Sequence, residues 1–199
     1  MNTSSAARPR IVVGISGASG VVYGIRMLQL LRKLDVESHL VMSKSAQVTL
    51  AYESDLSMAE VKAMADVAYS NSDIGAAISS GSFRVAGMVV APCSIKTMSE
   101  IASGVTGSLL SRAADVNLKE RRRLVLMVRE TPLHLGHIRS MAAVTEAGAI
   151  VYPPVPAFYA RPASLEEMVD HTVGRVLDLF GLDTGTVRRW NPRDGDPAG

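Results

Sequence analysis

The chain has 199 residues, of which 47% are hydrophobic and 20% charged, a size and composition typical of one compact globular domain and not of a disordered or fibrous protein. Its 21 basic and 19 acidic residues give a formal net charge of +2, which argues against a protein that coats nucleic acid. One cysteine excludes an internal disulfide framework and is typical of a reducing compartment, so we expect a cytoplasmic protein.

The two ends of the chain differ in composition from its middle. Residues 1–9 and 191–199 are Pro-, Gly-, Ser- or Asp-bearing and predicted to be flexible, whereas residues 10–190 are predicted to form a single domain. No apolar run approaches the roughly 18 residues that a membrane span needs, and the first residues lack the apolar segment of a signal peptide. We therefore expect no contact with a membrane.

Short apolar runs alternate with helical patterns between these ends. Continuous apolar runs predict buried strands over residues 11–15, 38–42, 87–91, 124–128 and 147–152. Because these runs do not alternate with polar residues, both faces of each strand should be buried, which predicts a parallel sheet with helices on either side. Such sheets bind ligands at the carboxyl ends of their strands, so the site is expected in the loops there.

Helices are predicted in the intervening segments. The spacing of apolar residues predicts one over residues 22–34, and another begins near Lys44. A last amphipathic helix is predicted over residues 165–180, with Ser164 as its N-cap and Gly181 as its stop.

The first strand-to-helix loop, residues 14–20, reads Gly-Ile-Ser-Gly-Ala-Ser-Gly. Its glycines let the backbone approach an anion, Ser16 and Ser19 supply hydroxyls, and the next helix points its N-terminus at the ligand. This favours a phosphate site; a tight turn without a ligand is the alternative. The loop lacks the Gly-Lys-Ser/Thr of a P-loop, and Met42-Ser43-Lys44 offers no acid for a ribose hydroxyl, so a mononucleotide such as FMN is favoured over a dinucleotide.

Residues 91–97, Ala-Pro-Cys-Ser-Ile-Lys-Thr, form a second loop of this kind. Ser94 and Thr97 either bind a ligand or only cap the following helix. Cys93 is more typical of a packed residue than of a nucleophile, because no histidine partner is evident. The polar loop over residues 79–82 leaves the same choice between ligand binding and structure open.

Charge is segregated within the nearly neutral total. Residues 112–139 carry seven basic and three acidic side chains, whereas residues 53–73 carry one basic and five acidic ones. Arg121 to Arg123 are predicted to be a solvated run. Arg129-Glu130 directly follows a predicted strand, and it forms either a buried salt bridge or a pair in which Arg binds phosphate and Glu handles a proton.

The remaining candidates lie late in the chain. His134 and His137 have a metal-pair spacing, but no acidic third ligand lies nearby in the sequence, so no metal is expected. Tyr159 lies in a proline-rich loop that either presents it to a ligand or closes the core, and Trp190 either covers a flat ring or caps the core.

Ten motifs of the chain recur together in one known family. They are Gly17-Ala-Ser19, Ser43-Lys44, Glu53, Pro92-Cys-Ser-Ile-Lys-Thr97, Arg112-Ala-Ala-Asp115, Lys119-Glu120, Arg129-Glu130, Pro156-Ala-Phe-Tyr159, Arg175 and Arg189-Trp190. With these motifs, residues 10–190 resemble the flavin prenyltransferases of the UbiX type, and residues 77–83 look like the branch of B subunits associated with hydroxyarylic acid decarboxylases. The resemblance implies an α/β fold, a Rossmann-like (flavodoxin-like) three-layer sandwich with a mostly parallel central sheet.

The resemblance also implies an activity. A metal-independent prenyltransferase would join the dimethylallyl group of dimethylallyl phosphate to reduced FMN, giving prenylated FMN and phosphate. Whether the monophosphate or the diphosphate is the preferred donor stays open. The product would be handed to a UbiD-type aromatic acid decarboxylase, and the chain would form a large homo-oligomer, commonly a dodecamer, with sites between subunits.

Roles for individual residues follow from the same resemblance. FMN would be bound by Gly17, Ala18, Ser19, Ser43, Ser94, Ile95, Lys96, Thr97 and Arg129. The prenyl phosphate would be bound by Arg112, Lys119, Arg129, Tyr159 and Arg175, and Trp190 would line the prenyl site. The implied catalytic residues are Ser19, Glu53, Lys119 and Glu130.

One segment departs from the family pattern, and two other functions remain open. Residues 134–141 read His-Leu-Gly-His-Ile-Arg-Ser-Met where the family often has Ser-x-Ile-His-Leu-Glu-Asn-Met, so Arg139 replaces an acid. One alternative is an FMN-dependent cysteine decarboxylase, although its Pro-x-Met-Asn-x-x-Met-Trp signature is absent from this sequence. The other is a flavin-carrier accessory subunit of a hydroxyarylic acid decarboxylase.

Overall fold

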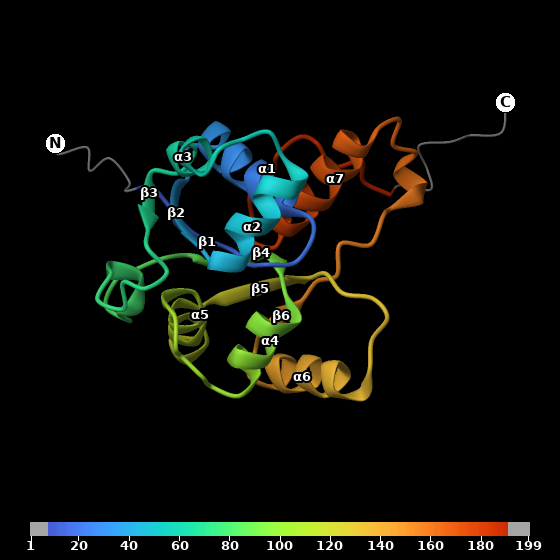
Figure 1. Cartoon of the computed structure of the whole chain (residues 1–199). Coiled ribbons are helices and arrows are strands. Elements are labelled where there is room, and N and C mark those ends of the chain that lie inside the picture. The colour runs from blue at the N-terminus through green and yellow to red at the C-terminus, as the bar shows by residue number, and fades with distance from the viewer. Residues whose placement is uncertain (1–7, 191–199) are drawn as a thin grey trace, which may run out of the picture. The chain divides into compact units, whose positions relative to one another are not determined.

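The structure is a computed structural model that describes residues 8–190 (Figure 1). The predicted flexible segments 1–9 and 191–199 lie outside the described residues, except for residues 8 and 9. The chain divides into two compact units, and the boundary between them in the sequence falls between Pro154 and Val155. The single domain over residues 10–190 stays a prediction, and each unit is described here by itself.

A parallel sheet forms the centre of the first unit (Figure 1). Within residues 8–154 it has six strands in the order β3-β2-β1-β4-β5-β6, and all their pairs are parallel. The strands are β1 (Arg10–Ile15), β2 (Glu37–Met42), β3 (Val67–Tyr69), β4 (Gly87–Cys93), β5 (Arg123–Val128) and β6 (Ile150–Val151). The order reverses direction between β1 and β4, which makes the carboxyl ends of these two strands the expected place for a ligand.

Helices cover both faces of this sheet, which confirms the three-layer α/β sandwich. They are α1 (Val21–Lys33), α2 (Lys44–Glu53), α3 (Met58–Ala63), α4 (Ile95–Ala102), α5 (Leu109–Lys119) and α6 (Leu135–Glu146), with a 3₁₀ turn η1 (Ala77–Ser79). Figure 1 shows α1 and α2 on one side of the sheet and α4, α5 and α6 on the other.

The strands of this parallel sheet are buried on both faces, as is typical of a sheet covered by helices on either side. All seven residues of β4 are buried, and in β1, β2 and β5 every residue after the first is buried. Met88, Leu110, Leu124 and Leu126 lie in the resulting core. Burying such side chains stabilises the fold by about 1.5–3 kcal/mol each, so the continuous apolar runs predicted this part of the fold correctly.

The sheet differs from the prediction at its two edges. The strand β3 was not predicted, because it has three residues, of which Val67 and Ala68 are exposed. The strand predicted over residues 147–152 is confined to Ile150 and Val151. Its first two residues serve α6 instead, since Ala147 is the C-cap and Gly148 has a φ of 106°, a conformation that favours glycine.

The second unit contains a 3₁₀ turn η2 (Phe158–Ala160) and the helix α7 (Leu165–Asp178). The N-cap prediction is confirmed, because the Ser164 hydroxyl accepts a hydrogen bond from the Glu167 N–H at 3.2 Å. Gly174 gives the following segment room to pack on α7, since a Cβ there would lie 2.6 Å from the Val187 side chain.

Candidate functional site

Three helices begin where β1, β2 and β4 end, at the edge of the sheet where a ligand is expected. Gly20, Ser43 and Ser94 occupy the N-cap positions of α1, α2 and α4. The loops are tied together by backbone hydrogen bonds, in which Ser43 N–H donates to Ile15 O and Arg129 N–H donates to Cys93 O. The candidate FMN residues of this unit therefore come from neighbouring strand ends, as the sequence predicted.

The buried Ser16 hydroxyl links the first loop to the loop after β4. It donates to Pro92 O at 2.9 Å and accepts from the Ser94 N–H at 2.7 Å. Because both interactions are internal and the side chain is fully buried, the prediction that Ser16 offers its hydroxyl to a ligand is wrong. Ser16 holds the two candidate ligand loops together instead.

Gly17 lies against the first turn of α2, and Ala18 beside it is buried. A Cβ on Gly17 would overlap the Ser45 side chain and lie 3.2 Å from the Ser45 carbonyl carbon. The glycine is therefore required by the close approach of α2, and it keeps the loop backbone free of side-chain cover at this point.

The N-terminus of α1 carries an internal anion. One carboxylate oxygen of Glu53, at the end of α2, accepts from the Gly20 and Val21 N–H groups at 2.8 and 3.1 Å. These N–H groups are thus occupied by Glu53, so the phosphate predicted at this loop would have to compete with a carboxylate for them.

The pKa of Glu53 reflects this arrangement. Partial burial raises it, but hydrogen bonds from Ser19 and from the two backbone N–H groups, together with the charge of Arg129, bring the pKa below its ordinary value. Glu53 is therefore a carboxylate at neutral pH, and it lies within electrostatic reach of Ser19 and Arg129.

Arg129 and Glu130 follow β5 at the same edge, and both are exposed. The buried salt bridge considered for this pair is therefore wrong. The charge of Arg129 also opposes the rise in the pKa of Tyr23 that burial causes, which places the guanidinium near the start of α1. Glu130 accepts a hydrogen bond from the Thr131 N–H at 3.0 Å.

Hydroxyls line the starts of α2 and α4. The Ser43 oxygen accepts from the Ala46 N–H at 3.1 Å, and the Ser94 hydroxyl accepts from the Thr97 N–H at 3.3 Å and donates to the Thr97 hydroxyl at 3.2 Å. Both serines are therefore caps, and the hydroxyl protons of Ser43 and Thr97 are left to donate to a further acceptor. Ile95 is half-buried, and Lys96 forms an ion pair with Glu100 at 2.7 Å.

Cys93 is fully buried, and burial raises the pKa of its thiol far above the ordinary value. A thiol in this state is a packed apolar group, not a nucleophile. This agrees with the prediction for Cys93.

Lys119, a candidate phosphate ligand at the end of α5, lies apart from Arg129. Lys119 ends α5 close to the start of β5, whereas Arg129 follows the end of β5. Six residues of strand separate these points by roughly 20 Å, so one chain does not bring Lys119 and Arg129 around one phosphate. Arg112 pairs with Asp115 at 2.7 Å, and Lys119 pairs with Glu120.

The predicted solvated run at 121–123 is wrong for its central residue. The Arg122 side chain is only 16% exposed, and its guanidinium donates to Phe83 O at 2.8 Å and to Gly81 O at 2.6 Å. These contacts join the end of α5 to the loop before β4.

The second unit holds the other three predicted substrate residues. The ring of Tyr159 makes edge-to-face contacts with His171 and Trp190, each with centroids 5.8 Å apart. Arg175 pairs with Asp178 at 2.6 Å. Tyr159 and Trp190 are thus brought together, and 71% of the Trp190 surface remains exposed.

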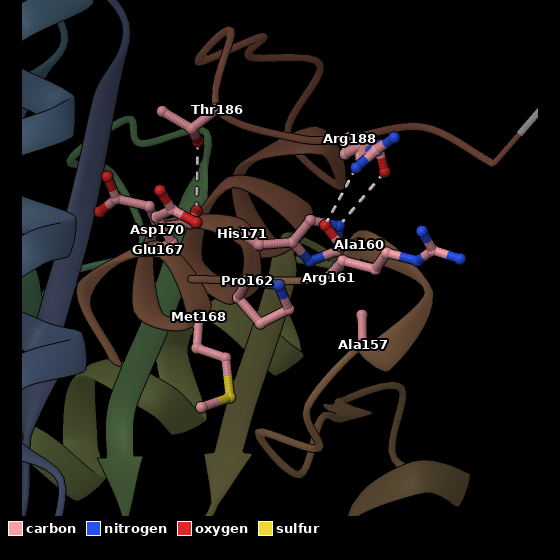
Figure 2. A pocket seen from close by; sticks show the side chains of 10 residues that line it. All are labelled: Ala157, Ala160, Arg161, Pro162, Glu167, Met168, Asp170, His171, Thr186 and Arg188. Carbon is pink, nitrogen blue, oxygen red and sulfur yellow. Dashed lines mark hydrogen bonds between the residues drawn. The ribbon is translucent and has the colours of Figure 1, made fainter. Parts of the chain in front are cut away.

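A pocket of about 400 Å³ lies in the same unit, and one of its lining residues is His171, which contacts the Tyr159 ring. His171 is nine-tenths buried at its wall, with Nε2 3.3 Å from Arg188 O. Figure 2 shows Glu167 and Asp170 on one side of His171 and Arg161 and Arg188 on the other. The pocket therefore presents both signs of charge.

Over residues 8–190, no group of three or more His, Cys, Asp or Glu side chains is placed to hold a metal ion. The His134 and His137 rings lie with their centroids 3.6 Å apart and their planes tilted by 34°, and His134 caps α6 by accepting a hydrogen bond from the Gly136 N–H. No helix in the same range is long and apolar enough to cross a membrane.

Comparison with known proteins agrees with this fold and loop arrangement. Residues 2–177 match the flavoprotein family, and the chain belongs to it. The chain is 56% identical to the flavin prenyltransferase UbiX of Thauera aromatica over 91% of this chain and 93% of the relative. Within the flavoproteins, the chain therefore belongs to the UbiX-type flavin prenyltransferases.

Solved structures of UbiX-type proteins are similar to it as well. AnUbiX in complex with FMN and dimethylallyl pyrophosphate is 55% identical, with a TM-score of 0.91 over 92% of this chain and 98% of that chain. A dodecameric FMN-dependent UbiX-like decarboxylase from Escherichia coli O157:H7 is 47% identical, with a TM-score of 0.89 over 92% of this chain and 99% of that chain.

The structure adds residues that sequence reasoning missed. Tyr23 lies within electrostatic reach of Arg129, and Gly81 and Arg122 contact the end of α5. The position of Tyr23 in the first turn after the glycine-rich loop was a usable signal. The contacts of Arg122 had none, because three consecutive arginines are typical of an exposed surface.

Proposed function

We propose that the chain is a flavin prenyltransferase that joins the dimethylallyl group of dimethylallyl phosphate to reduced FMN and releases phosphate and prenylated FMN. The observation that carries this proposal is its 55% identity and TM-score of 0.91 to AnUbiX, a structure that contains FMN and dimethylallyl pyrophosphate. Because that relative holds the pyrophosphate, both prenyl donors belong in the test.

The loops at the carboxyl edge of the sheet have the donors that FMN needs. Ser43 and Thr97 retain hydroxyl protons to donate, and the exposed Arg129 guanidinium suits a phosphate. Since Glu53 occupies the N-terminus of α1, we assign the phosphate to these groups and the ring system to the backbone at Gly17, Ala18 and Ser19. Ile95 and Lys96, the first two residues of α4, would complete the FMN site. When bound, reduced FMN supplies the nucleophile of the reaction.

The leaving group requires cations. As the allylic carbon–oxygen bond breaks, its electron pair passes to the phosphate, and each preorganised cation there can lower the barrier by a few kcal/mol. We assign this role to Arg112, Lys119, Arg129 and Arg175, with the Tyr159 hydroxyl as a further donor. Trp190, exposed and apolar, would wall the prenyl chain and exclude water.

Proton transfer is assigned to the acids near Arg129. The lowered pKa of Glu53 keeps it in the carboxylate form, the form with an open position for a proton, and the Ser19 hydroxyl donates a hydrogen bond to it. Glu130 at the end of β5 is a second carboxylate at the same edge.

The separation of Lys119 from Arg129 supports a site shared between subunits. A neighbouring copy would supply Lys119 to the Arg129 of another chain. Exposed apolar residues on and before α6, namely Leu133, Leu135 and Ile138, offer a surface for such contacts. The related dodecamer supports a homo-oligomer of that size.

The experiment is turnover by the purified protein. Mixed anaerobically with reduced FMN and dimethylallyl phosphate or diphosphate, it should release phosphate (or diphosphate) and change the flavin spectrum. FMN binding without turnover of either donor would contradict the proposal and favour a flavin carrier. Oxidative decarboxylation of a peptide with a C-terminal cysteine would favour a cysteine decarboxylase.

The cellular context is part of the same proposal. Prenylated FMN would pass to a UbiD-type decarboxylase. The test is to add the products of the prenyltransferase reaction to a purified apo-decarboxylase, which should then become active. A cytoplasmic location is supported by the lone buried Cys93, which is typical of a reducing compartment.

A further inference from the structure

The loop of residues 79–83, which starts at the last residue of η1 and leads toward β4, is held against α5 by two arginines. Arg112 Nε donates to Ser79 O at 3.2 Å, and Arg122 donates to Gly81 O and Phe83 O at 2.6 and 2.8 Å. Two guanidinium groups thus bind three carbonyls of this 79–83 loop. One belongs to Arg112 in the first turn of α5, and the other to Arg122 just after the end of α5. Such charge-assisted hydrogen bonds are about twice as strong as neutral ones.

The far side of the loop is fixed to the sheet. The Phe83 ring meets the buried His39 ring edge-on with centroids 5.1 Å apart, and the Arg10 guanidinium lies 5.1 Å from the Phe83 centroid. The loop is therefore anchored at Phe83 and again at Ser79. Its central residue, Gly81, has little freedom to move away from α5.

Gly81 lies directly against the head groups that end α5. A Cβ on Gly81 would lie 2.7 Å from Lys119 Nζ and would overlap the Glu120 carboxylate. The backbone at Gly81 is not in the left-handed region, so the glycine is needed for space and not for its conformation. The loop consequently limits where the Lys119 ammonium can lie.

Glu120 lies between two cations at this point. Its carboxylate pairs with Lys119, and its other oxygen is 3.9 Å from Arg122 Nη2. The hydrogen bond and charge of Lys119 lower the pKa of Glu120. Arg122 thus acts on Lys119 in two ways, through the loop and by sharing its counter-ion.

We propose that Gly81 and Arg122 are positioning residues for the prenyl-phosphate site, which set the place of the Lys119 ammonium and the Arg112 guanidinium. The proposal rests on the proposed function only in taking these two cations as phosphate ligands. Neither Gly81 nor Arg122 needs to touch the substrate. The sequence left open whether this polar loop binds a ligand or is structural. In this proposal its role is to position the two cations.

The test measures binding of dimethylallyl phosphate by calorimetry to the protein loaded with oxidised FMN, which separates binding from turnover. Gly81→Ala should weaken this binding about tenfold, because the added methyl displaces an ammonium from its phosphate. The FMN dissociation constant and the melting temperature should stay as in wild type. Gly107→Ala is the matched control, since a Cβ there meets nothing within 4 Å.

A double-mutant cycle identifies the route of the effect. If Gly81 acts through Lys119, Gly81→Ala should add little in a Lys119→Ala background. Arg122→Lys, which cannot hold two carbonyls with one planar fork, should also weaken binding, and Arg122→Gln more so.

The outcomes separate this proposal from the proposed function. Wild-type affinity in Gly81→Ala, or an equal loss in the presence and absence of Lys119, would overturn the positioning role alone. Wild-type protein that binds dimethylallyl phosphate without turning it over would overturn the proposed function alone. Wild-type protein that does not bind it would overturn both.

Discussion

In the candidate FMN site, individual hydroxyl and carboxylate groups form hydrogen bonds within the protein itself. Ser16 bridges the loops after β1 and β4 with both of its hydrogen-bonding directions. Glu53 occupies the start of α1, where a phosphate was expected. At the scale of the residue, polar groups that the sequence offered to a ligand are partly used by the protein itself.

Ser16→Ala should therefore act on stability and on FMN binding together. The change leaves the Ser94 N–H without its acceptor, at a cost of about 1–3 kcal/mol, and the melting temperature should fall by several degrees. Thermal unfolding and an FMN titration measure the two effects. Ser103→Ala is the control, because its exposed hydroxyl donates only to the nearby Ser99 and Glu100 carbonyls of α4, the helix that it ends. Equal behaviour of the two variants would contradict the bridge.

A buried histidine ties together β2 and β3, the strands at one side of the sheet. His39 in β2 contacts the Tyr69 hydroxyl of β3 through Nδ1 and Glu37 through Nε2, both at 2.9 Å. Burial lowers the pKa of His39, which outweighs the opposing hydrogen bond and charge of Glu37. The neutral ring is therefore the form that the folded sheet favours.

This lowered pKa predicts a loss of stability in mild acid. The unfolded chain takes up a proton near pH 6.5, the ordinary value for histidine, while folded His39 resists protonation until a lower pH. The unfolded state then binds more protons, so the free energy of unfolding falls as pH decreases below about 6.5. Denaturant titrations at about pH 7 and pH 5 should show a smaller decrease in His39→Gln; the same decrease as in wild type would contradict the assignment.

Much of this architecture could be predicted from the chain itself. Strands β1, β2, β4 and β5 are buried on both faces, so their continuous apolar runs were informative. The strand β3 could not be predicted, because Val67 and Ala68 are exposed and the segment therefore has no apolar pattern. The hydrogen-bond partners of individual side chains could not be predicted from the apolar pattern. Ser16 resembles a hydroxyl that binds a ligand and Arg122 resembles a surface charge until their acceptors, which are distant in the sequence, are known.

The whole molecule explains why one basic segment does not make one phosphate site. Arg112, Lys119 and Arg129 are close in sequence, yet α5 and β5 carry Lys119 and Arg129 to opposite edges of the sheet. Sequence proximity could not reveal this, because a strand between two charges separates them by its full length. A site that uses both cations must take them from two copies of the chain.

Subunit mixing tests this consequence. Lys119→Ala alone should lower kcat/KM about a hundredfold or more, because a leaving-group cation is lost. Arg129→Ala subunits should also be poorly active by themselves. Co-expressed hetero-oligomers should recover activity, since some sites then combine the intact Arg129 of one chain with the intact Lys119 of another. Activity no greater than that of the separate variants would contradict a shared site.

The central claim is the transfer of a dimethylallyl group to the flavin, and the mass of the flavin tests it most directly. After anaerobic incubation with reduced FMN and dimethylallyl phosphate, the flavin released from the protein should be heavier than the reduced FMN supplied by one C5H8 unit, with one phosphate formed per flavin. A flavin of unchanged mass, released from folded protein that had bound both compounds, would contradict the account.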